Sequence, residues 1–261
     1  TVAYLHTDFI HKGVPQKCLR AVWQTPEARG LKEPPLAPVA RVAPADLLHE
    51  MLSRENIASK EFLQREYDTR VQGRTVIPAF IGTISDVPSD AFVQKLEYER
   101  PGAVACGIGL NPTFGKIDTY DMAMLSANEG LMRVVAVGAD PDRAANNGNY
   151  CWPGVLPDES DEPEYKTAQL VRAAKAQYDF AMGTGVATIS GKDSMKIQGN
   201  ILDENGRRHR VFGLPAIQFA TIGHVPDAGA CVTADFKKSG DIIYIVGPKT
   251  QDELGGSELY E

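Results

Sequence analysis

The segment from residue 184 to residue 196 gathers side chains suited to handling a phosphate group. A short run at 186–189 has the character of a strand, and a polar stretch follows it. Four candidate binding residues stand there in succession: Gly191, Lys192, Asp193 and Ser194. Glycine lets the backbone approach a ligand, lysine supplies positive charge, aspartate can hold Mg²⁺, and serine can hydrogen-bond an oxygen. This inventory predicts a loop after a strand that binds a polyphosphate and its metal.

The same segment does not fit the Walker A pattern of phosphate-binding loops. That pattern requires a glycine, four residues and then Gly-Lys-Ser/Thr. Here five residues separate Gly185 from Gly191, and Asp193 stands between the lysine and the serine. A polar surface turn with no ligand has the same composition. From these residues alone, both interpretations stay open.

A second polar stretch lies at residues 146–153, where three asparagines stand close together. Side-chain amides in such a cluster predict either an Asx-type loop or the lining of a polar pocket. We assign Asn149 to nucleotide or substrate binding on the second interpretation.

Residues 118–137 form the most strongly predicted helix, because apolar side chains surround it on nearly every side. Such a helix is expected to be buried. Glu129 and Arg133 are one turn apart, so an i,i+4 ion pair is the simplest interpretation of their spacing. Asp118 is expected to be an N-cap or first-turn acid. About 16 Å of helix separates it from Glu129, too far for one metal ion to bind both.

Composition excludes several classes of function. The chain has 261 residues, 43% of them apolar, and a net charge of -7, which argues against a nucleic-acid-binding surface. No apolar run is long enough to span a bilayer, and no signal-peptide pattern begins the chain. The four cysteines and five histidines are scattered without metal-ligand spacing. We therefore expect a cytoplasmic protein with reduced thiols and without a zinc site.

The remaining elements are expected to position these groups. Residues 1–45 predict an N-terminal strand and a proline-rich, extended linker, followed by helices from Pro44 to Leu52 and from Ser59 to Tyr67. The other predicted elements are strands at 75–84, 91–97, 103–110, 212–224 and 241–246, a long helix at 164–182, and a hairpin turn at Asn205–Gly206. A lone strand followed by a Gly-Gly turn predicts that residues 231–261 are the truncated start of another domain.

Ten short stretches resemble the second half of the phosphoribosylformylglycinamidine synthases and run in the same order. They are residues 9–15, 56–61, 67–68, 71–73, 88–91, 115–118, 136–143, 149–153, 190–196 and 253–257. The resemblance covers nearly the whole chain. It implies an α/β (α+β) fold similar to the N-terminal domain of the aminoimidazole ribonucleotide synthetase-like proteins. The mixed sheet of that domain pairs with a twin into a barrel. The implied boundaries are 1–45, 46–230 for this α/β domain, and 231–261 for the start of a C-terminal domain.

The resemblance also implies a reaction and its cofactors. ATP, with Mg²⁺, phosphorylates the formyl amide oxygen of formylglycinamide ribonucleotide, and ammonia from glutamine then displaces phosphate. The implied partners are the first half of the synthetase and a glutaminase domain or subunit, because no glutaminase signature is present here. A sheet edge left unpaired by the missing half predicts a homodimer in isolation. No nucleic acid or membrane is implied.

Individual positions follow from the resemblance. Asp90 and Glu129 match positions associated with Mg²⁺, and the next position of that set is Arg133 instead of the usual asparagine. Lys192 stands where many relatives have a metal-binding asparagine. Arg133 or Lys192 could therefore supply the positive charge in place of a metal ion. No histidine matches the catalytic one of the family, and we assign no general base.

Three functions remain in competition. The chain is expected to contribute residues to the active site of an amidine-forming ligase and to be inactive alone. The alternative is a non-catalytic half that binds a nucleotide structurally, or binds nothing. A third possibility is another enzyme of the same superfamily, such as aminoimidazole ribonucleotide synthetase or one that handles selenophosphate or thiamine phosphate. The order of the motifs disfavours the third, and Arg133 with Lys192 separates the first two.

Overall fold

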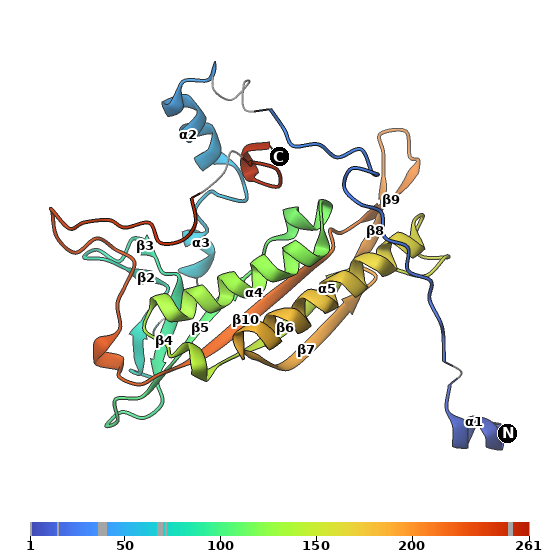
Figure 1. Ribbon diagram of the computed structural model, residues 1–261, viewed down its shortest axis with the longest axis horizontal. Coiled ribbons are helices and arrows are strands. Elements are labelled where there is room, and N and C mark those ends of the chain that lie inside the picture. The colour runs from blue at the N-terminus through green and yellow to red at the C-terminus, as the bar shows by residue number, and fades with distance from the viewer. Residues whose placement is uncertain are drawn as a thin grey trace.

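A computed structural model describes residues 2–14, 16–35, 41–66, 70, 72–249 and 253–260. Its centre is a six-stranded mixed sheet in the order β1-β4-β5-β10-β6-β7 (Figure 1). These strands are β1 (Thr75–Ile77), β4 (Ala91–Lys95), β5 (Ala103–Gly109), β10 (Ala216–Val225), β6 (Ala144–Trp152) and β7 (Ala187–Met195). All neighbours are antiparallel except β6 and β7, which are parallel and joined through a helix. The mixed sheet expected from the resemblance is therefore present.

Two helices, α4 (Thr119–Ala136) and α5 (Pro163–Thr184), lie side by side across one face of this sheet (Figure 1). Both agree with the helices predicted from the sequence. The principal core fills the space between helices and sheet, and Met122, Trp152 and Phe219 are fully buried in it. A second cluster, which includes Ile77, continues the core towards β1 and β4. No helix formed by the described residues covers the opposite face of the sheet.

Glycines let α4 lie directly on the strands. A Cβ on Gly109 of β5 would stand 1.9 Å from the carbonyl oxygen of Ser126, and one on Gly107 would stand 2.8 Å from the Cβ of Arg133. From the helix side, a Cβ on Gly130 would stand 2.5 Å from the Thr221 hydroxyl of β10. Real Cβ atoms do not approach other atoms so closely, so only glycine is compatible with this crossing.

The prediction that α4 is buried on every side is wrong. Residues such as Ala123, Ala127 and Val134 are buried against the sheet, but Met132 is 62% exposed and Leu125 is 40% exposed. The helix crosses the outside of a two-layer structure, so only its inner stripe is covered. The N-cap prediction is confirmed, because the Asp118 carboxylate accepts a hydrogen bond from the amide of Tyr120 at 2.8 Å.

The N-terminal region is held to α5 by its aromatic and charged residues. Trp23 stacks on Tyr165 with ring centroids 5.4 Å apart. The Arg29 guanidinium lies over the Tyr165 ring, 4.1 Å from its centroid, and pairs with Glu162 at 2.8 Å. Helix α1 (Thr7–Lys12) precedes this contact. The predicted N-terminal strand is wrong: residues 2–6 form no strand, because no neighbouring strand pairs with them in the described chain.

Smaller elements surround the sheet. They are α2 (Pro44–Ser53), α3 (Glu61–Gln64), β2 (Phe80–Ile81), β3 (Val87–Pro88), β8 (Gln198–Leu202), β9 (Arg208–Phe212) and the 3-10 turns η2 (Pro112–Lys116), η3 (Pro141–Arg143), η4 (Ala228–Ala230) and η5 (Glu258–Tyr260). The predicted strand at 75–84 is divided into β1 and β2. The predicted hairpin at Asn205–Gly206 joins β8 to β9. Tyr67, the expected end of the second helix, lies outside the described residues.

The segment after the sheet differs from its prediction. Residues 241–246 form no strand, although Ile245 and Val246 have strong strand propensity. Both are more than 90% exposed, and no strand of the described chain lies beside them to supply hydrogen bonds. Among the described helices, none has the length and apolar character needed to cross a membrane.

Candidate functional site

The predicted phosphate loop is a strand. Residues 187–195 form β7, and the asparagine-rich stretch predicted as a loop forms β6 beside it. In the parallel register Lys192 stands next to Asn149, and Ser194 stands next to Cys151. The Lys192 ammonium donates to the Ser194 hydroxyl at 2.5 Å. The structure therefore brings Asn149, Lys192 and Ser194 together.

Strand alternation separates Asp193 from its predicted partners. Tyr150, which pairs with Asp193, donates from its hydroxyl to Gln177 of α5 at 2.6 Å, so this pair points to the helix side. Neighbouring residues in a strand point to opposite faces, so Lys192 points to the uncovered face of the sheet. Burial, with a smaller contribution from the Asp193 charge, raises the pKa of Tyr150 to about 12. Tyr150 therefore stays a hydrogen-bond donor at neutral pH.

Gly191 has a structural reason to be glycine. A Cβ there would stand 3.1 Å from the carbonyl oxygen of Gly148 on β6. Gly148 itself lies close to Gln177 and Phe219, so a larger residue at position 148 would press on these two side chains. The glycine lets β7 approach β6 closely. This packing accounts for a glycine at position 191 without any contact to a ligand.

Both oxygens of the Glu129 carboxylate accept hydrogen bonds from protein donors. Arg133 donates to one oxygen at 2.7 Å, which confirms the i,i+4 pair. The other oxygen accepts from the amide of Leu110 at 2.9 Å and from the Asn111 side chain at 3.0 Å. Arg133 also reaches the backbone carbonyl of Asp90 at 3.3 Å. A guanidinium thus occupies the position beside Glu129 where the resemblance implies a metal, and no metal-type cluster of three His, Cys, Asp or Glu is found among the described residues.

Replacing Glu129 by alanine is expected to lower the free energy of unfolding by about 1 kcal/mol, because two neutral donors and an ion pair lose their acceptor. Replacing Arg133 by alanine should cost less, about 0.5 kcal/mol, because both partners are about one-third exposed. Urea denaturation of the two variants checks this order. An equal or larger loss in Arg133→Ala would show that the ion pair, and not the bonds to Leu110 and Asn111, stabilises this corner.

The two groups of predicted site residues lie far apart in the sheet. Asp90 immediately precedes β4, whereas Lys192 lies on the edge strand β7, with β5, β10 and β6 between them. Four strand spacings of about 4.8 Å separate them by roughly 19 Å. A single ion bound to this chain therefore cannot touch both groups.

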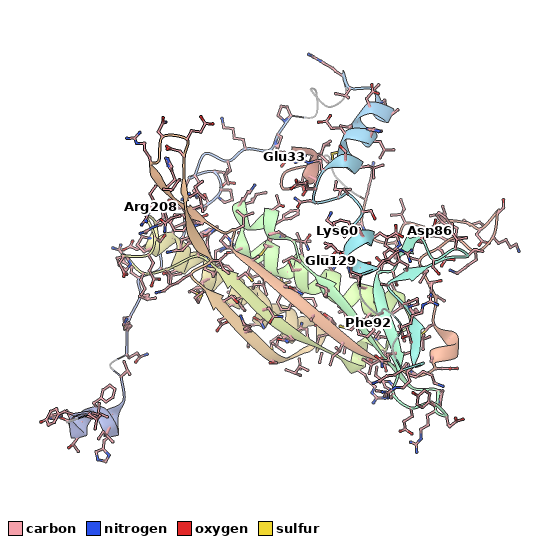
Figure 2. All side chains as sticks on the ribbon, turned by 180° about the vertical axis from the view of Figure 1, so that it is seen from behind. Glu33, Lys60, Asp86, Phe92, Glu129 and Arg208 are labelled. Carbon is pink, nitrogen blue, oxygen red and sulfur yellow. The ribbon has the colours of Figure 1, made fainter. Side chains whose placement is uncertain are left out.

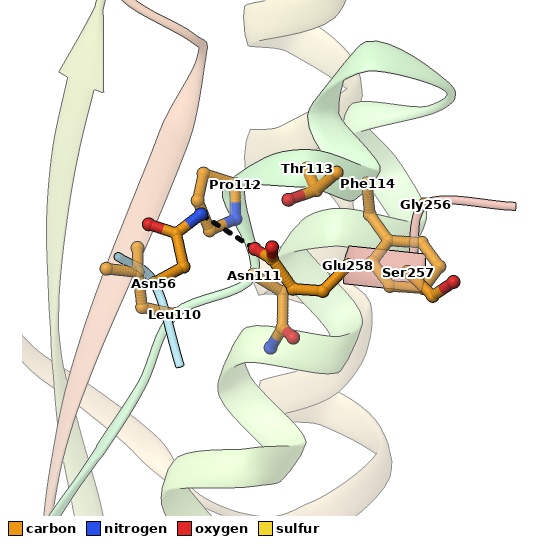
Figure 3. Close-up of a pocket in the computed structure, with 9 residues that line it drawn as sticks. All are labelled: Asn56, Leu110, Asn111, Pro112, Thr113, Phe114, Gly256, Ser257 and Glu258. Carbon is orange, nitrogen blue, oxygen red and sulfur yellow. Dashed lines mark hydrogen bonds between the residues drawn. The ribbon is translucent and has the colours of Figure 1, made fainter. Parts of the chain in front are cut away.

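A cleft of about 490 Å³ (Figure 3) is lined in part by Leu110 and Asn111, the two neighbours that donate to Glu129. The other lining residues are Asn56, Pro112, Thr113, Phe114, Gly256, Ser257 and Glu258. Asn56 donates to Glu258 across the cleft at 2.7 Å, the contact dashed in Figure 3.

Sequence reasoning assigned no role to the residues of this cleft. A signal was nevertheless present, because stretches 56–61 and 253–257, both quoted for the family resemblance, meet at it. Stretch 115–118 begins at the next residue after the lining Phe114. Their meeting depends on contacts between segments about 200 positions apart, such as Asn56 with Glu258.

Similarity to curated proteins covers most of the chain. The subunit PurL of phosphoribosylformylglycinamidine synthase from Methanothrix thermoacetophila is 30% identical over 242 residues, 92% of this chain and 28% of that protein. The corresponding subunit from Thermococcus sibiricus is 32% identical over 82% of this chain and 26% of its own length. The human phosphoribosylformylglycinamidine synthase is 27% identical over 87% of this chain and 17% of its length.

These relatives confirm the resemblance found in the sequence, and the chain spans about a quarter of the length of the first two. No family model matches. Among solved structures, PurLQS from Thermotoga maritima is 21% identical with a TM-score of 0.48, over 68% of this chain and 25% of that one. That likeness is too low to support a conclusion about function.

Proposed function

We propose that this chain, which is related over most of its length to the phosphoribosylformylglycinamidine synthases, is part of an ATP-dependent amidine-forming ligase. The reaction converts formylglycinamide ribonucleotide and glutamine-derived ammonia to formylglycinamidine ribonucleotide. The observation that carries the proposal is 30–32% identity to two archaeal synthase subunits over 82–92% of the chain. Because the chain spans a quarter of those proteins, it would act with the first half of the synthetase and with a glutaminase domain or subunit.

The uncovered face of the sheet supports a pairing with a twin domain. Phe92 on β4 and Ile108 on β5 are each 48% exposed, and Ile222 on β10 is 39% exposed. Phe92, which Figure 2 labels, and Ile222 both pair with Cys106 in register, so the three residues form one apolar row across three strands. A six-stranded sheet with such a face is suited to close against a second sheet, as in the proposed barrel. The boundaries 46–230 for this domain and 231–261 for the start of the next belong to the same proposal.

The polar end of that face is the proposed nucleotide or substrate site. Lys192 and Ser194 would donate to phosphate oxygens, and Asn149 beside them would orient the ligand through its amide. Asp193 points to the other side, so its part would be indirect, through Tyr150. A second domain closing over this face would exclude water and strengthen each of these electrostatic contacts.

Binding of Mg²⁺ by Asp90 and Glu129 would require the donors around Glu129 to rearrange. Mg²⁺ prefers carboxylate oxygens and water, and Asp90 with Glu129 are the carboxylates implied for it. Both oxygens of Glu129 already have protein donors, and Arg133 supplies the positive charge there. The residues present therefore fit an arginine cation better than a metal in this arrangement. This observation favours the alternative function, a non-catalytic half whose pocket supports the catalytic one.

Calorimetric titration with ADP, with and without Mg²⁺, distinguishes a pocket that uses a metal from one in which basic residues replace it. If the pocket uses a metal, Mg²⁺ should strengthen ADP binding and Asp90→Ala should abolish that gain. If the basic residues have replaced the metal, binding should be independent of Mg²⁺ and should weaken at least tenfold in Lys192→Ala, with Lys238→Ala as a charge-matched control. Absence of binding at millimolar ADP, with ADP binding restored by the first half of the synthetase, would assign the site to the assembled enzyme.

A further inference from the structure

A glycine-rich turn near the end of the described chain holds a carboxylate on its backbone amides. The amides of Leu254 and Gly255 both donate to one oxygen of Glu33, at 2.6 and 2.9 Å. Glu33 lies 221 positions earlier in the chain, in the proline-rich segment (Figure 2). Two converging amides on one oxygen are the arrangement by which backbone binds anions.

The turn is built to present these amides. The carbonyl of Leu254 accepts from the amide of Ser257 at 3.1 Å and from its hydroxyl at 2.6 Å, which closes the turn on its inner side. Gly256 has φ of 77°, a conformation that favours glycine. A Cβ on Gly255 would stand 2.8 Å from Glu33 Oε2, so glycine at this position lets an anion reach the backbone.

The space around the turn suits a larger anion than one carboxylate. A cavity of about 430 Å³ adjoins Gly255 and Gly256, and the side chains of Lys32 and Lys116 line it with Glu33. Removal of the Glu33 carboxylate would leave the two amide donors open to this space, with Lys32, Lys116 and Glu27 in its lining. Charge-assisted donors of this kind bind phosphate oxygens.

Glu33 is able to leave without unfolding the domain. Its side chain is exposed, and residues 31–35 have no helix or strand. The same segment is anchored ten and four positions earlier, by Trp23 on Tyr165 and by Arg29 on Glu162. These anchors can persist while the distal end moves.

We propose that the Leu254–Gly255 amides form a binding site for a phosphate-type oxyanion, and that Glu33 is its internal, displaceable occupant. The ligand is either free phosphate or a phosphoryl group carried by a nucleotide. Lys192 does not line this cavity, so the site is separate from the proposed nucleotide site and does not rest on the proposed function.

Backbone amide NMR of the whole chain tests the proposal, with orthophosphate and Mg²⁺-free ADP titrated separately. Phosphate is expected to shift the Leu254 and Gly255 amides, and Glu33→Ala should bind it about tenfold more tightly if Glu33 fills the turn in about nine of ten molecules. Glu27→Ala is the matched control, because Glu27 lines the same cavity and belongs to the same segment. It should raise the affinity much less than Glu33→Ala, because it removes a charge from the cavity without freeing the amides. Adding Gly255→Ala to Glu33→Ala should abolish binding, because the Cβ blocks the approach to the amides.

Shifts caused by orthophosphate identify free phosphate as sufficient, whereas shifts caused by ADP alone identify a nucleotide-borne phosphoryl group. Glu33→Gln, which keeps the side-chain length and removes the charge, serves if Glu33→Ala does not fold. Equal affinity in the parent chain and both Glu33 variants would overturn the competition. The absence of any shift at the two amides in Glu33→Gln, with each ligand raised to about 10 mM, roughly ten times the Kd of a millimolar site, would overturn the site itself.

Discussion

Replacing Gly109 by alanine is expected to destabilise the domain by about 4 kcal/mol or more, the largest effect of any substitution considered for this chain. The new Cβ would stand 1.9 Å from the Ser126 carbonyl oxygen and 2.7 Å from the Gly130 amide nitrogen. Both atoms belong to the backbone of α4, so a side-chain rotation cannot relieve the clash. The helix must move away from β5, which opens the core and pulls Glu129 from the Leu110 amide. Urea denaturation measures the loss.

Gly183→Ala is the control for this prediction. Gly183 lies in α5, and a Cβ there would meet no atom within 4 Å. Alanine has the higher helix propensity, so this variant should be more stable by about 0.5–1 kcal/mol. A Gly109→Ala variant as stable as the parent chain would mean that α4 does not rest directly on β5.

Replacing Asp118 by alanine is expected to cost about 3 kcal/mol, because one carboxylate makes two separate contributions. It caps the N-terminus of α4 through the Tyr120 amide. It also binds Arg172 of α5 through two hydrogen bonds, one of them 2.9 Å from Nε, and its side chain is only 13% exposed. The variant leaves the Arg172 guanidinium, which lies 4.3 Å from the ring centroid of Trp23, without its carboxylate.

Asp118→Asn divides the two contributions. Its side-chain oxygen can still accept from the Tyr120 amide, so the cap is kept while the charge is lost. We expect about half of the destabilisation caused by Asp118→Ala. Thermal unfolding followed by far-ultraviolet circular dichroism gives both values, and Trp23 fluorescence reports the arginine stacking. Equal losses in the two variants would assign the whole effect to the ion pair and none to the cap.

Features that depend on neighbouring positions in the chain were predictable. The helices at 119–136 and 163–184 follow from apolar spacing, and the hairpin at Asn205–Gly206 follows from its turn residues. The Asp118 cap and the Glu129–Arg133 pair are also local, since each joins groups within four positions. The physical reason is that helical geometry places such groups together whatever surrounds them.

Strand formation in this chain depended on pairing partners and not on local composition. Residues 144–152 and 187–195 are rich in asparagine, glycine and polar residues that disfavour strands, yet they form β6 and β7 because β10 and the βαβ connection supply partners. Residues 241–246 have the opposite composition and form no strand, since no described strand lies beside them. Strand formation depends on a neighbour that the local sequence does not contain.

The candidate sites also combine features that the sequence indicates with features that only the tertiary structure decides. Residue types alone were compatible with phosphate binding at Lys192. The order of short motifs indicated the family and, through it, a metal-binding role for Glu129. Only the folded chain separated Asp193 from Lys192 across the sheet, set Asp90 four strands from Lys192, and placed Glu33 on the Leu254–Gly255 amides. Chemical capability belongs to a side chain and can be read from its type. Which groups meet is decided by strand pairing and by contacts between segments about 200 positions apart, and these arise from the whole chain at once.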